Sequence, residues 1–263
     1  MQLVDLKFRP GVDKQDTAYS AGDDRKYIDS DFVRFHYGKP ERWSGWTNLP
    51  NPNKTIVGVV RDTHSWVGLD GLRYLALGTN RKLYIYNEGA VYDITPIRET
   101  QALTNPFTTN GTTTVSVADT GHNAIQGDFV TFDSFSSIDG LDMNQEFEII
   151  SITDANNYTV THTSTASGST SGGGGSGNAK YQINVGPATS TYGLGWGTDT
   201  WSSGTWGTAS SASDVVIVGR NWSLDNFGED LIATVLDGGT FIWDTSGGLA
   251  SRATALSNAP TAS

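Results

Sequence analysis

The chain lacks cysteine entirely among its 263 residues, which excludes disulfide bridges and thiolate metal sites. It is also poor in positive charge, because 17 lysines and arginines stand against 28 aspartates and glutamates, giving a formal net charge of −11. Binding of a phosphate backbone over a broad surface depends on clustered Lys and Arg. The charge balance therefore argues against that mode of nucleic-acid binding, although not against contact with DNA that must slide.

Long apolar runs are missing as well. Residues 1–10 hold no apolar segment of the kind a signal peptide requires, and no later window approaches the length of a membrane span. The sequence predicts no membrane-spanning segment, no signal peptide and folding in a cytoplasm.

What the chain has in quantity is glycine and aromatic residues. It holds 31 glycines, 11% aromatics and many Thr and Ser, with only 37% hydrophobic residues. This composition suits many short strands joined by turns, and 263 residues suffice for one large or two small domains. We therefore expect an all-β protein.

One pattern occurs twice. Without gaps, residues 74–87 align with residues 231–244, and each copy reads as a hairpin: an apolar run, a turn, and a second run with aromatics two apart. The turns are Thr79-Asn80 in the first copy and residues 237–239 in the second, where positive φ angles are expected.

The aromatics of the second runs are Tyr84 with Tyr86, and Phe241 with Trp243. Because side chains two apart share a strand face, each pair is expected to pack on another sheet. In the first copy Gly89 leads into a third strand, residues 90–94, which makes a meander. Repeated meanders with aromatic and glycine landmarks are typical of β-propeller blades. Two ordinary hairpins of a sandwich are the alternative.

A different composition lies between the two copies. From residue 102 to residue 179, Thr and Val alternate in four or five short strands at about ten-residue spacing, which predicts a small β-barrel or sandwich. The flanking segments 94–97 and 181–183 look like neighbouring strands of one host sheet, so the block is interpreted as an inserted domain. Its Gly/Ser-rich end, residues 164–177, is predicted to be a flexible exit hinge.

The expected organisation has three parts. Residues 1–46 form an extended N-terminal arm with a short strand near residues 31–37; residues 47–101 and 180–263 form a propeller-like domain that is incomplete within this chain; residues 102–179 form the inserted domain with its exit hinge. A propeller needs four or more blades to close. Either the chain is a fragment or a partner completes the ring.

No catalytic constellation stands out. The four histidines, His36, His64, His122 and His162, are far apart, and plain surface roles are expected for His64 and His122. The cluster Asp23, Asp24, Asp29 and Asp31 offers oxygen ligands for calcium, but a solvated acidic arm is the favoured interpretation. The prediction is no catalytic residue, no metal site and no cofactor.

Two further patterns leave alternatives open. Carboxylates are numerous enough that a glycosidase pair is not excluded by count, and Ser223–Gly228 comes near an Asp-box turn, although we interpret it as a blade turn. Trp196, Trp201 and Trp206 recur every five residues, which is neither a strand nor a helix period. Such rings either stack on sugars or, as we favour, fill the space between blades or subunits.

The N-terminal string carries a family resemblance. The string comprises Phe8-Arg9-Pro10-Gly11, Thr17, Tyr19, Asp31-Phe32-Val33-Arg34-Phe35, Gly38-Lys39-Pro40-Glu41-Arg42 and Gly45-Trp46. It resembles the opening of the tail nozzle proteins of short-tailed bacteriophages, also called tail tubular protein B or packaged-DNA stabilisation protein. The hairpins and residues 194–207 are similar to the same family, so the resemblance covers about two-thirds of the chain.

The resemblance implies a structural virion protein of a podovirus tail and not an enzyme. It implies a homo-oligomer, a six-fold ring (a hexamer), that retains packaged DNA and conducts it during DNA ejection. The implied partners are a tail adaptor protein above the ring, tail spike, fibre or needle proteins nearby, and double-stranded DNA in transient, non-specific passage. Assembly would take place in the host cytoplasm.

The residues expected to matter under this interpretation are structural. Phe8, Pro10, Gly11, Val33, Arg34 and Phe35 would dock the arm; Trp46, Tyr84, Tyr86, Phe241 and Trp243 would pack blades; Trp196, Trp201 and Trp206 would lie at an interface. The alternatives are a carbohydrate-binding module for host-surface polysaccharide, which uses the exposed tryptophans, and a propeller-based glycan hydrolase.

Overall fold

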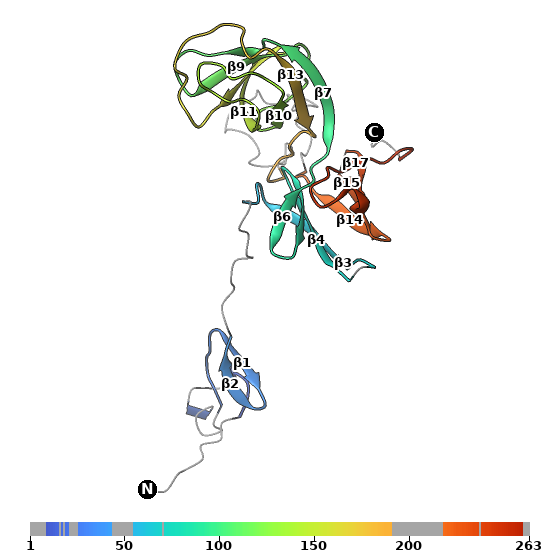
Figure 1. Cartoon of the computed structure of the whole chain (residues 1–263). Helices are drawn as coiled ribbons and strands as arrows, with labels where there is room; N and C mark the ends of the chain where they lie inside the picture. The colour runs from blue at the N-terminus through green and yellow to red at the C-terminus, as the bar shows by residue number, and fades with distance from the viewer. Residues whose placement is uncertain are drawn as a thin grey trace, which may run out of the picture. The chain divides into compact units, whose positions relative to one another are not determined.

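The protein is all-β. The computed structural model describes residues 9–15, 17, 19–20, 26–43, 55–69, 71–190, 218–236 and 238–259. These residues form seventeen strands and one short 3-10 turn at Thr245–Gly247 (Figure 1). The chain divides into two compact units, Met1–Pro50 and Asn51–Ser263.

The first unit carries a hairpin of β1 (Val33–His36) and β2 (Lys39–Arg42). Its two-residue turn, Tyr37-Gly38, has φ angles of 49° and 72°, the backbone that tight hairpin turns require. Pro40 lies within β2, where the ladder tolerates it because a two-stranded sheet has only edge strands.

The second unit contains two four-stranded antiparallel sheets, each in simple meander order. The first sheet consists of β3 (Val60–Val67), β4 (Arg73–Thr79), β5 (Leu83–Asn87) and β6 (Ala90–Asp93). The second sheet consists of β14 (Trp222–Phe227), β15 (Asp230–Val235), β16 (Thr240–Trp243) and β17 (Thr254–Ala255). Both sheets have the form of propeller blades, as the sequence repeat predicts.

The gap-free alignment of the two hairpins holds for their first strands and is wrong by one residue in their second strands. Leu77 pairs with Tyr84, but the aligned Thr234 pairs with Thr240 and not with Phe241. The second hairpin therefore turns with one residue fewer. A slip of one residue moves every side chain to the opposite face of a strand.

The first turn also differs from the prediction. Among the described residues, neither Thr79 nor Asn80 has a positive φ. The turn is instead closed by the Thr79 hydroxyl, whose Oγ1 accepts hydrogen bonds from the backbone N–H of Arg81 at 3.1 Å and of Lys82 at 2.7 Å. This local side-chain bond replaces the left-handed backbone that a glycine would supply.

The two sheets share one apolar core. The first sheet and the residue after it contribute Trp66, Tyr74, Ala76, Leu83, Ile85 and Ile94, and the second contributes Trp222, Leu224, Leu231, Ala233, Val235, Trp243 and the nearby Ala253. Trp222 joins them most closely: its Nε1 donates to the carbonyl oxygen of Thr79 at 2.7 Å. A Cβ on Gly78 would lie 2.6 Å from the Trp222 ring, so only glycine fits beneath it.

The inserted domain is a small β-barrel. Its strands are β7 (Ile97–Thr104), β8 (Phe107–Thr108), β9 (Thr114–Ala118), β10 (Phe129–Asp133), β11 (Glu146–Asp154), β12 (Asn157–Thr161) and β13 (Ser176–Gln182). They run in the order β7-β13-β10-β11-β12-β9-β8, and a bridge between Phe107 and Gly173 closes the barrel. Its core is its own: seventeen buried apolar residues, all between Phe107 and Tyr181.

The insert's ends are neighbouring strands, as predicted, but they belong to the barrel sheet and not to a host sheet. Ile97 pairs with Gln182 inside the barrel sheet, and among the described strands β7 and β13 pair with no strand of either four-stranded sheet. The alternation that identified strands on both sides of the insert was correct, but alternation alone does not say which sheet a strand joins.

The prediction of a flexible hinge over residues 164–177 is also wrong. Gly173 exchanges two backbone hydrogen bonds with Phe107, at 2.8 and 3.2 Å, and the carbonyl oxygen of Gly174 accepts from Ser136 N–H at 2.8 Å. Two of the glycines, Gly174 and Gly177, lie where the backbone passes close to an aromatic ring. A Cβ on Gly174 would lie 2.5 Å from Phe107, and one on Gly177 would lie 2.5 Å from the carbonyl oxygen of Asp133.

Candidate functional site

The feature that links the parts of the second unit is a cluster of charges, which we call the charged junction. It consists of the buried Lys82 and Asp93 and the partly exposed Glu146 and Arg252. Lys82 ends the Thr79 turn, and its side chain is only 1% exposed. Its Nζ lies 2.8 Å from Asp93 Oδ2 and 2.5 Å from Glu146 Oε1, and it sits 4.2 Å from the centre of the Phe129 ring. A buried ammonium group is costly unless it is paired, and here two carboxylates lie beside it.

Asp93, the last residue of β6, is the acceptor at the centre of the junction. Its Oδ1 accepts from Arg252 Nη1 at 2.7 Å and from Thr95 Oγ1 at 2.6 Å, while its Oδ2 faces Lys82. Burial disfavours the charged form, but Arg252 and Lys82 outweigh it and lower the pKa of Asp93 to about 2.

Glu146 brings the barrel into the junction, since it is the first residue of β11. Besides Lys82, its side chain accepts from Gln182 Nε2 at 2.6 Å and lies 3.6 Å from Arg252 Nη2. The junction thus joins three parts: the first sheet through Lys82 and Asp93, the barrel through Glu146, and the chain after β16 through Arg252.

Arg81 makes a second connection between the first sheet and the barrel, beside the junction. Its Nη2 lies 2.6 Å from Glu148 Oε1 of β11 and donates to the carbonyl oxygen of Gly127 at 2.8 Å. Its guanidinium also lies 4.8 Å from the centre of the Phe129 ring. The charges of the junction are paired with one another, and these ion pairs connect the barrel to the sheets.

A second buried network lies on the barrel side. The Tyr158 and Tyr181 hydroxyls are 2.8 Å apart, and the Tyr181 hydroxyl donates to Asp119 Oδ2. Burial raises the pKa of the Asp119 carboxyl, and burial likewise raises the pKa of both tyrosines. The network fills the barrel interior with satisfied hydroxyl groups.

His122 belongs to the same region, and the prediction of a surface role for it is wrong: the residue is 2% exposed. Its Nδ1 accepts from Ala124 N–H at 3.0 Å, so the neutral ring carries its proton on Nε2, which donates to the carbonyl oxygen of Asp154 at 3.2 Å. The turn signals beside it are real, but the ring turns inward against Tyr158, with 5.0 Å between ring centres.

The other histidines also lie apart. His36 contacts Glu41 at 3.2 Å in the first unit, His64 bonds Asn226 at 2.9 Å, and His162 bonds the carbonyl oxygen of Asp142 at 3.2 Å. In the described part of the chain there is no group of three or more His, Asp or Glu arranged to hold a metal ion. Of the acidic arm cluster, Asp29 is paired with Lys14 at 3.0 Å, while Asp23 and Asp24 lie outside the described residues.

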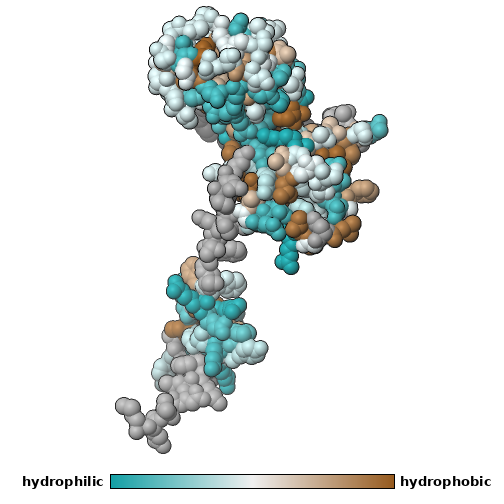
Figure 2. Space-filling model, in the orientation of Figure 1, coloured by the Kyte–Doolittle hydropathy of each residue, from teal (hydrophilic) through white to brown (hydrophobic). Residues whose placement is uncertain are grey.

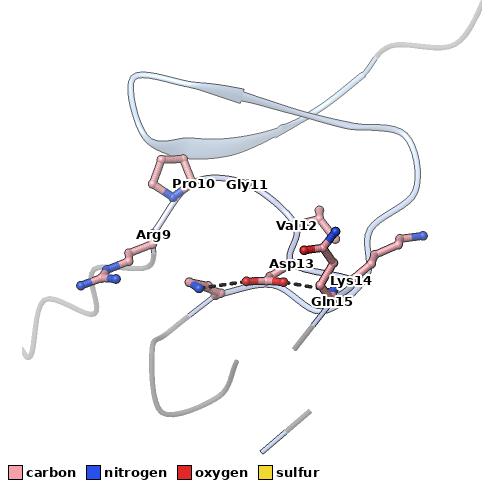
Figure 3. Close-up of a pocket in the computed structure, with 8 residues that line it drawn as sticks. Arg9, Pro10, Gly11, Val12, Asp13, Lys14 and Gln15 are labelled. Carbon is pink, nitrogen blue, oxygen red and sulfur yellow. Dashed lines mark hydrogen bonds and ion pairs between the residues drawn. The ribbon is translucent and has the colours of Figure 1, made fainter. Parts of the chain in front are cut away.

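The arm residues expected to dock lie in the first unit. Pro10 and Gly11 line an open pocket of about 530 Å³, crossed by the ion pair between Asp13 and Lys26 at 2.9 Å (Figure 3). Arg34 pairs with Glu41 across the β1–β2 hairpin at 3.1 Å, and Phe35 lies against Tyr27 with 5.5 Å between ring centres.

Phe8, Trp46, Trp196, Trp201 and Trp206 lie outside the described residues.

The aromatic side chains of the two hairpins lie on different faces of their sheets. Phe241 and Trp243 face the core shared by the two sheets, where Trp243 meets Tyr74 at 5.9 Å. Tyr84 and Tyr86 face away from the second sheet, because of the one-residue difference between the hairpins, and pack with Leu77 and Val91. The Tyr84 hydroxyl oxygen there accepts from Val57 N–H at 3.0 Å.

Sequence reasoning missed the charged junction entirely. A signal was present, since Lys82 directly precedes the apolar strand Leu83–Asn87 and Asp93 lies between Tyr92 and Ile94, so opposite charges end neighbouring strands. The partners Glu146 and Arg252 come from distant parts of the chain and carry no local signal.

Comparison with protein-family models and with curated proteins finds no match. Among solved structures, the chain is similar to "Phage phi92 endosialidase", with 12% sequence identity and a TM-score of 0.29. The alignment covers 73% of this chain and 29% of that chain, so this chain spans less than a third of the other protein's length. A likeness this low carries no argument about fold or activity. In the described residues, no helix has the length and apolar character to cross a membrane.

Proposed function

We propose that the chain is a structural subunit of a short-tailed phage tail, forming part of the nozzle ring that retains packaged DNA and conducts it during ejection. The observation that carries the proposal is the pair of blade-like meanders on either side of an inserted barrel. Blade-like sheets assemble side by side around an axis, and two such sheets do not close a ring. The N-terminal string from Phe8 to Trp46 supplies the link to the nozzle family.

The exposed apolar side chains support a packing role for the sheets. Val67, Leu69 and Phe227 are 61%, 95% and 77% exposed, and they lie near the adjoining ends of β3 and β14, where Leu69 N–H donates to Glu229 Oε1 at 2.6 Å. Apolar residues exposed together mark protein contacts more often than isolated ones do. We assign them to the contact with a neighbouring subunit.

The charged junction supports a role that transmits force. Ion pairs that link the barrel to both sheets keep the three parts in one arrangement, which suits a subunit under load from packaged DNA. In this proposal the chain has no catalytic role, and its net charge of −11 favours an acidic channel that repels DNA phosphates and prevents sticking.

Cryo-electron microscopy of purified particles containing the chain tests the proposal. We expect a six-fold ring below the tail adaptor. Single copies on peripheral fibres, or absence from the particle, would overturn it. On the isolated protein, Leu69→Ser with Phe227→Ser should abolish ring assembly in light scattering, whereas Ile150→Ser, at a 44% exposed position on the barrel, should leave assembly unchanged.

A further inference from the structure

A pocket of about 240 Å³ lies where the start of the barrel meets the second sheet. Its lining includes Arg98 of β7, Arg220 just before β14, Asn184, and Gly238, Gly239 and Phe241 from the turn and strand of the second hairpin. Two guanidinium groups in one small pocket are unusual in a chain of such negative net charge.

Both arginines have a buried N–H group that lacks an acceptor among the described residues. These groups are Nε of Arg98 and Nη1 of Arg220. A buried donor without an acceptor costs about 1–3 kcal/mol, and more when the group is charged. Burial also lowers the pKa of the Arg220 guanidinium, which Asp128 opposes. An acceptor that carries negative charge would relieve both costs.

Each arginine side chain is held in place by contacts of its other atoms. Arg98 Nη2 donates to the carbonyl oxygen of His122 at 2.6 Å, and the guanidinium lies 5.2 Å from the centre of the Tyr181 ring. Arg220 lies directly on the backbone of Gly186, where an added Cβ would come within 2.4 Å of its Nε. Side chains fixed before binding lose little entropy when a ligand arrives.

Two nearby carboxylates are engaged elsewhere, whereas Asp119, which interacts electrostatically with Arg98, has a buried Oδ1 without a hydrogen-bond partner among the described residues. Glu99 reaches Arg98 Nη1 only at 3.5 Å. Asp128 accepts three hydrogen bonds, from the N–H of Ile125 at 2.9 Å, from Val185 N–H at 2.7 Å and from Asn184 Nδ2 at 2.7 Å. Arg98 and Arg220 therefore line a pocket beside which Glu99 and Asp128 already have donors.

We propose that this pocket binds a small oxyanion, a phosphate, sulfate or carboxylate, between Arg98 and Arg220. Planar guanidinium groups match the oxygen geometry of these anions and form charge-assisted hydrogen bonds with them. The phosphate or sulfate comes from solution, and the carboxylate from a small organic acid or an acidic side chain of a neighbouring subunit.

The test is isothermal titration of the full chain with sodium phosphate, sodium sulfate and sodium acetate, each at an ionic strength held constant with sodium chloride. We expect saturable binding of at least one of these anions. A preference for phosphate or sulfate would indicate a tetrahedral anion as the ligand, and a preference for acetate would indicate a carboxylate. Arg220→Gln should weaken that binding at least tenfold. The matched control Arg61→Gln, on the exposed side of β3, should bind as the unmodified chain does.

Three results would overturn the proposal: no binding of any of the three anions, binding by Arg220→Gln equal to that of the unmodified chain, or equal loss in Arg61→Gln. If Arg220→Gln does not fold, as judged by circular dichroism, Arg98→Lys replaces it, because lysine keeps the charge but removes Nε. Undiminished anion binding by Arg98→Lys would then contradict the assigned geometry.

Discussion

The barrel and the pair of sheets bury their apolar residues in different ways. The barrel closes on itself and encloses seventeen core residues of its own, and among its described residues only Ile125 and Ile150 are large apolar side chains left exposed. The sheets share a core that neither completes alone, and they leave Val59, Val60, Val67, Leu69, Phe227 and Leu236 exposed on or beside their strands. In Figure 2, brown residues accordingly gather over the sheets more than over the barrel. Closure removes sheet edges, whereas open sheets keep surfaces for further packing.

Trp222→Ala should have the largest effect on the free energy of unfolding, because it removes a side chain from the core that the two sheets share. It removes a buried indole and leaves the carbonyl oxygen of Thr79 without its donor. We expect a loss of about 4 kcal/mol in the free energy of unfolding, measured by urea titration. Trp43→Ala, at a 57% exposed position in the first unit, should change it by less than about 0.5 kcal/mol. Equal losses would contradict the shared core.

Lys82→Met should separate the barrel from the sheets. It leaves Asp93 and Glu146 with Arg252 as their remaining cation in the junction, which should cost about 3 kcal/mol. We expect two unfolding transitions instead of one, measured by tyrosine and tryptophan fluorescence. Lys180→Met, which breaks an ion pair with Asp133 at a 43% exposed side chain, should cost less than about 1 kcal/mol and preserve one transition.

Gly174→Ala tests whether the Gly/Ser-rich run belongs to the barrel. Both a φ of +100° and a clash with Phe107 oppose a side chain there, so we expect a loss of about 3 kcal/mol. Gly121→Ala has a φ of +71° in open space and should cost about 1 kcal/mol, measured in the same denaturation series. A flexible hinge would tolerate Gly174→Ala without loss.

Acid should weaken the junction before it weakens the barrel. The pKa of Asp93 is lowered from 3.8 to about 2, so its contribution to stability is present above pH 4 and is lost as the pH falls through about 2. This contribution amounts to about 2 kcal/mol. Denaturation titrations between pH 5 and pH 2 should show that loss, and Asp93→Asn should flatten it. An unchanged slope in Asp93→Asn would contradict the role of this carboxyl.

The sequence predicts strands better than it predicts their partners. Alternation and turn residues identify both meanders and the barrel strands, since these signals are local. The one-residue difference between the hairpins could not be predicted, because it depends on how the Thr79 hydroxyl closes a turn. The same limit explains why Tyr84 and Phe241 were expected on equivalent faces.

Composition alone gave a wrong prediction for residues 164–177, because packing against the barrel determines their structure. Residues 164–177 have the composition of a linker, yet Gly174 and Gly177 are required by the rings of Phe107 and Phe135. For a related reason, only the Lys82 and Asp93 half of the charged junction carries a local signal: Glu146 and Arg252 join it only after the barrel and sheets have formed. Long-range contacts of this kind have no local pattern.

The central claim is that the charged junction holds the barrel and the sheets in one fixed arrangement. Because the chain has no cysteine, Thr161→Cys on the barrel and Ser223→Cys on the second sheet can be spin-labelled selectively, and both positions are exposed. Double electron–electron resonance should give one narrow distance distribution in this protein and a broad one when Lys82→Met is added. A broad distribution with Lys82 intact, or a narrow one without it, would contradict the claim.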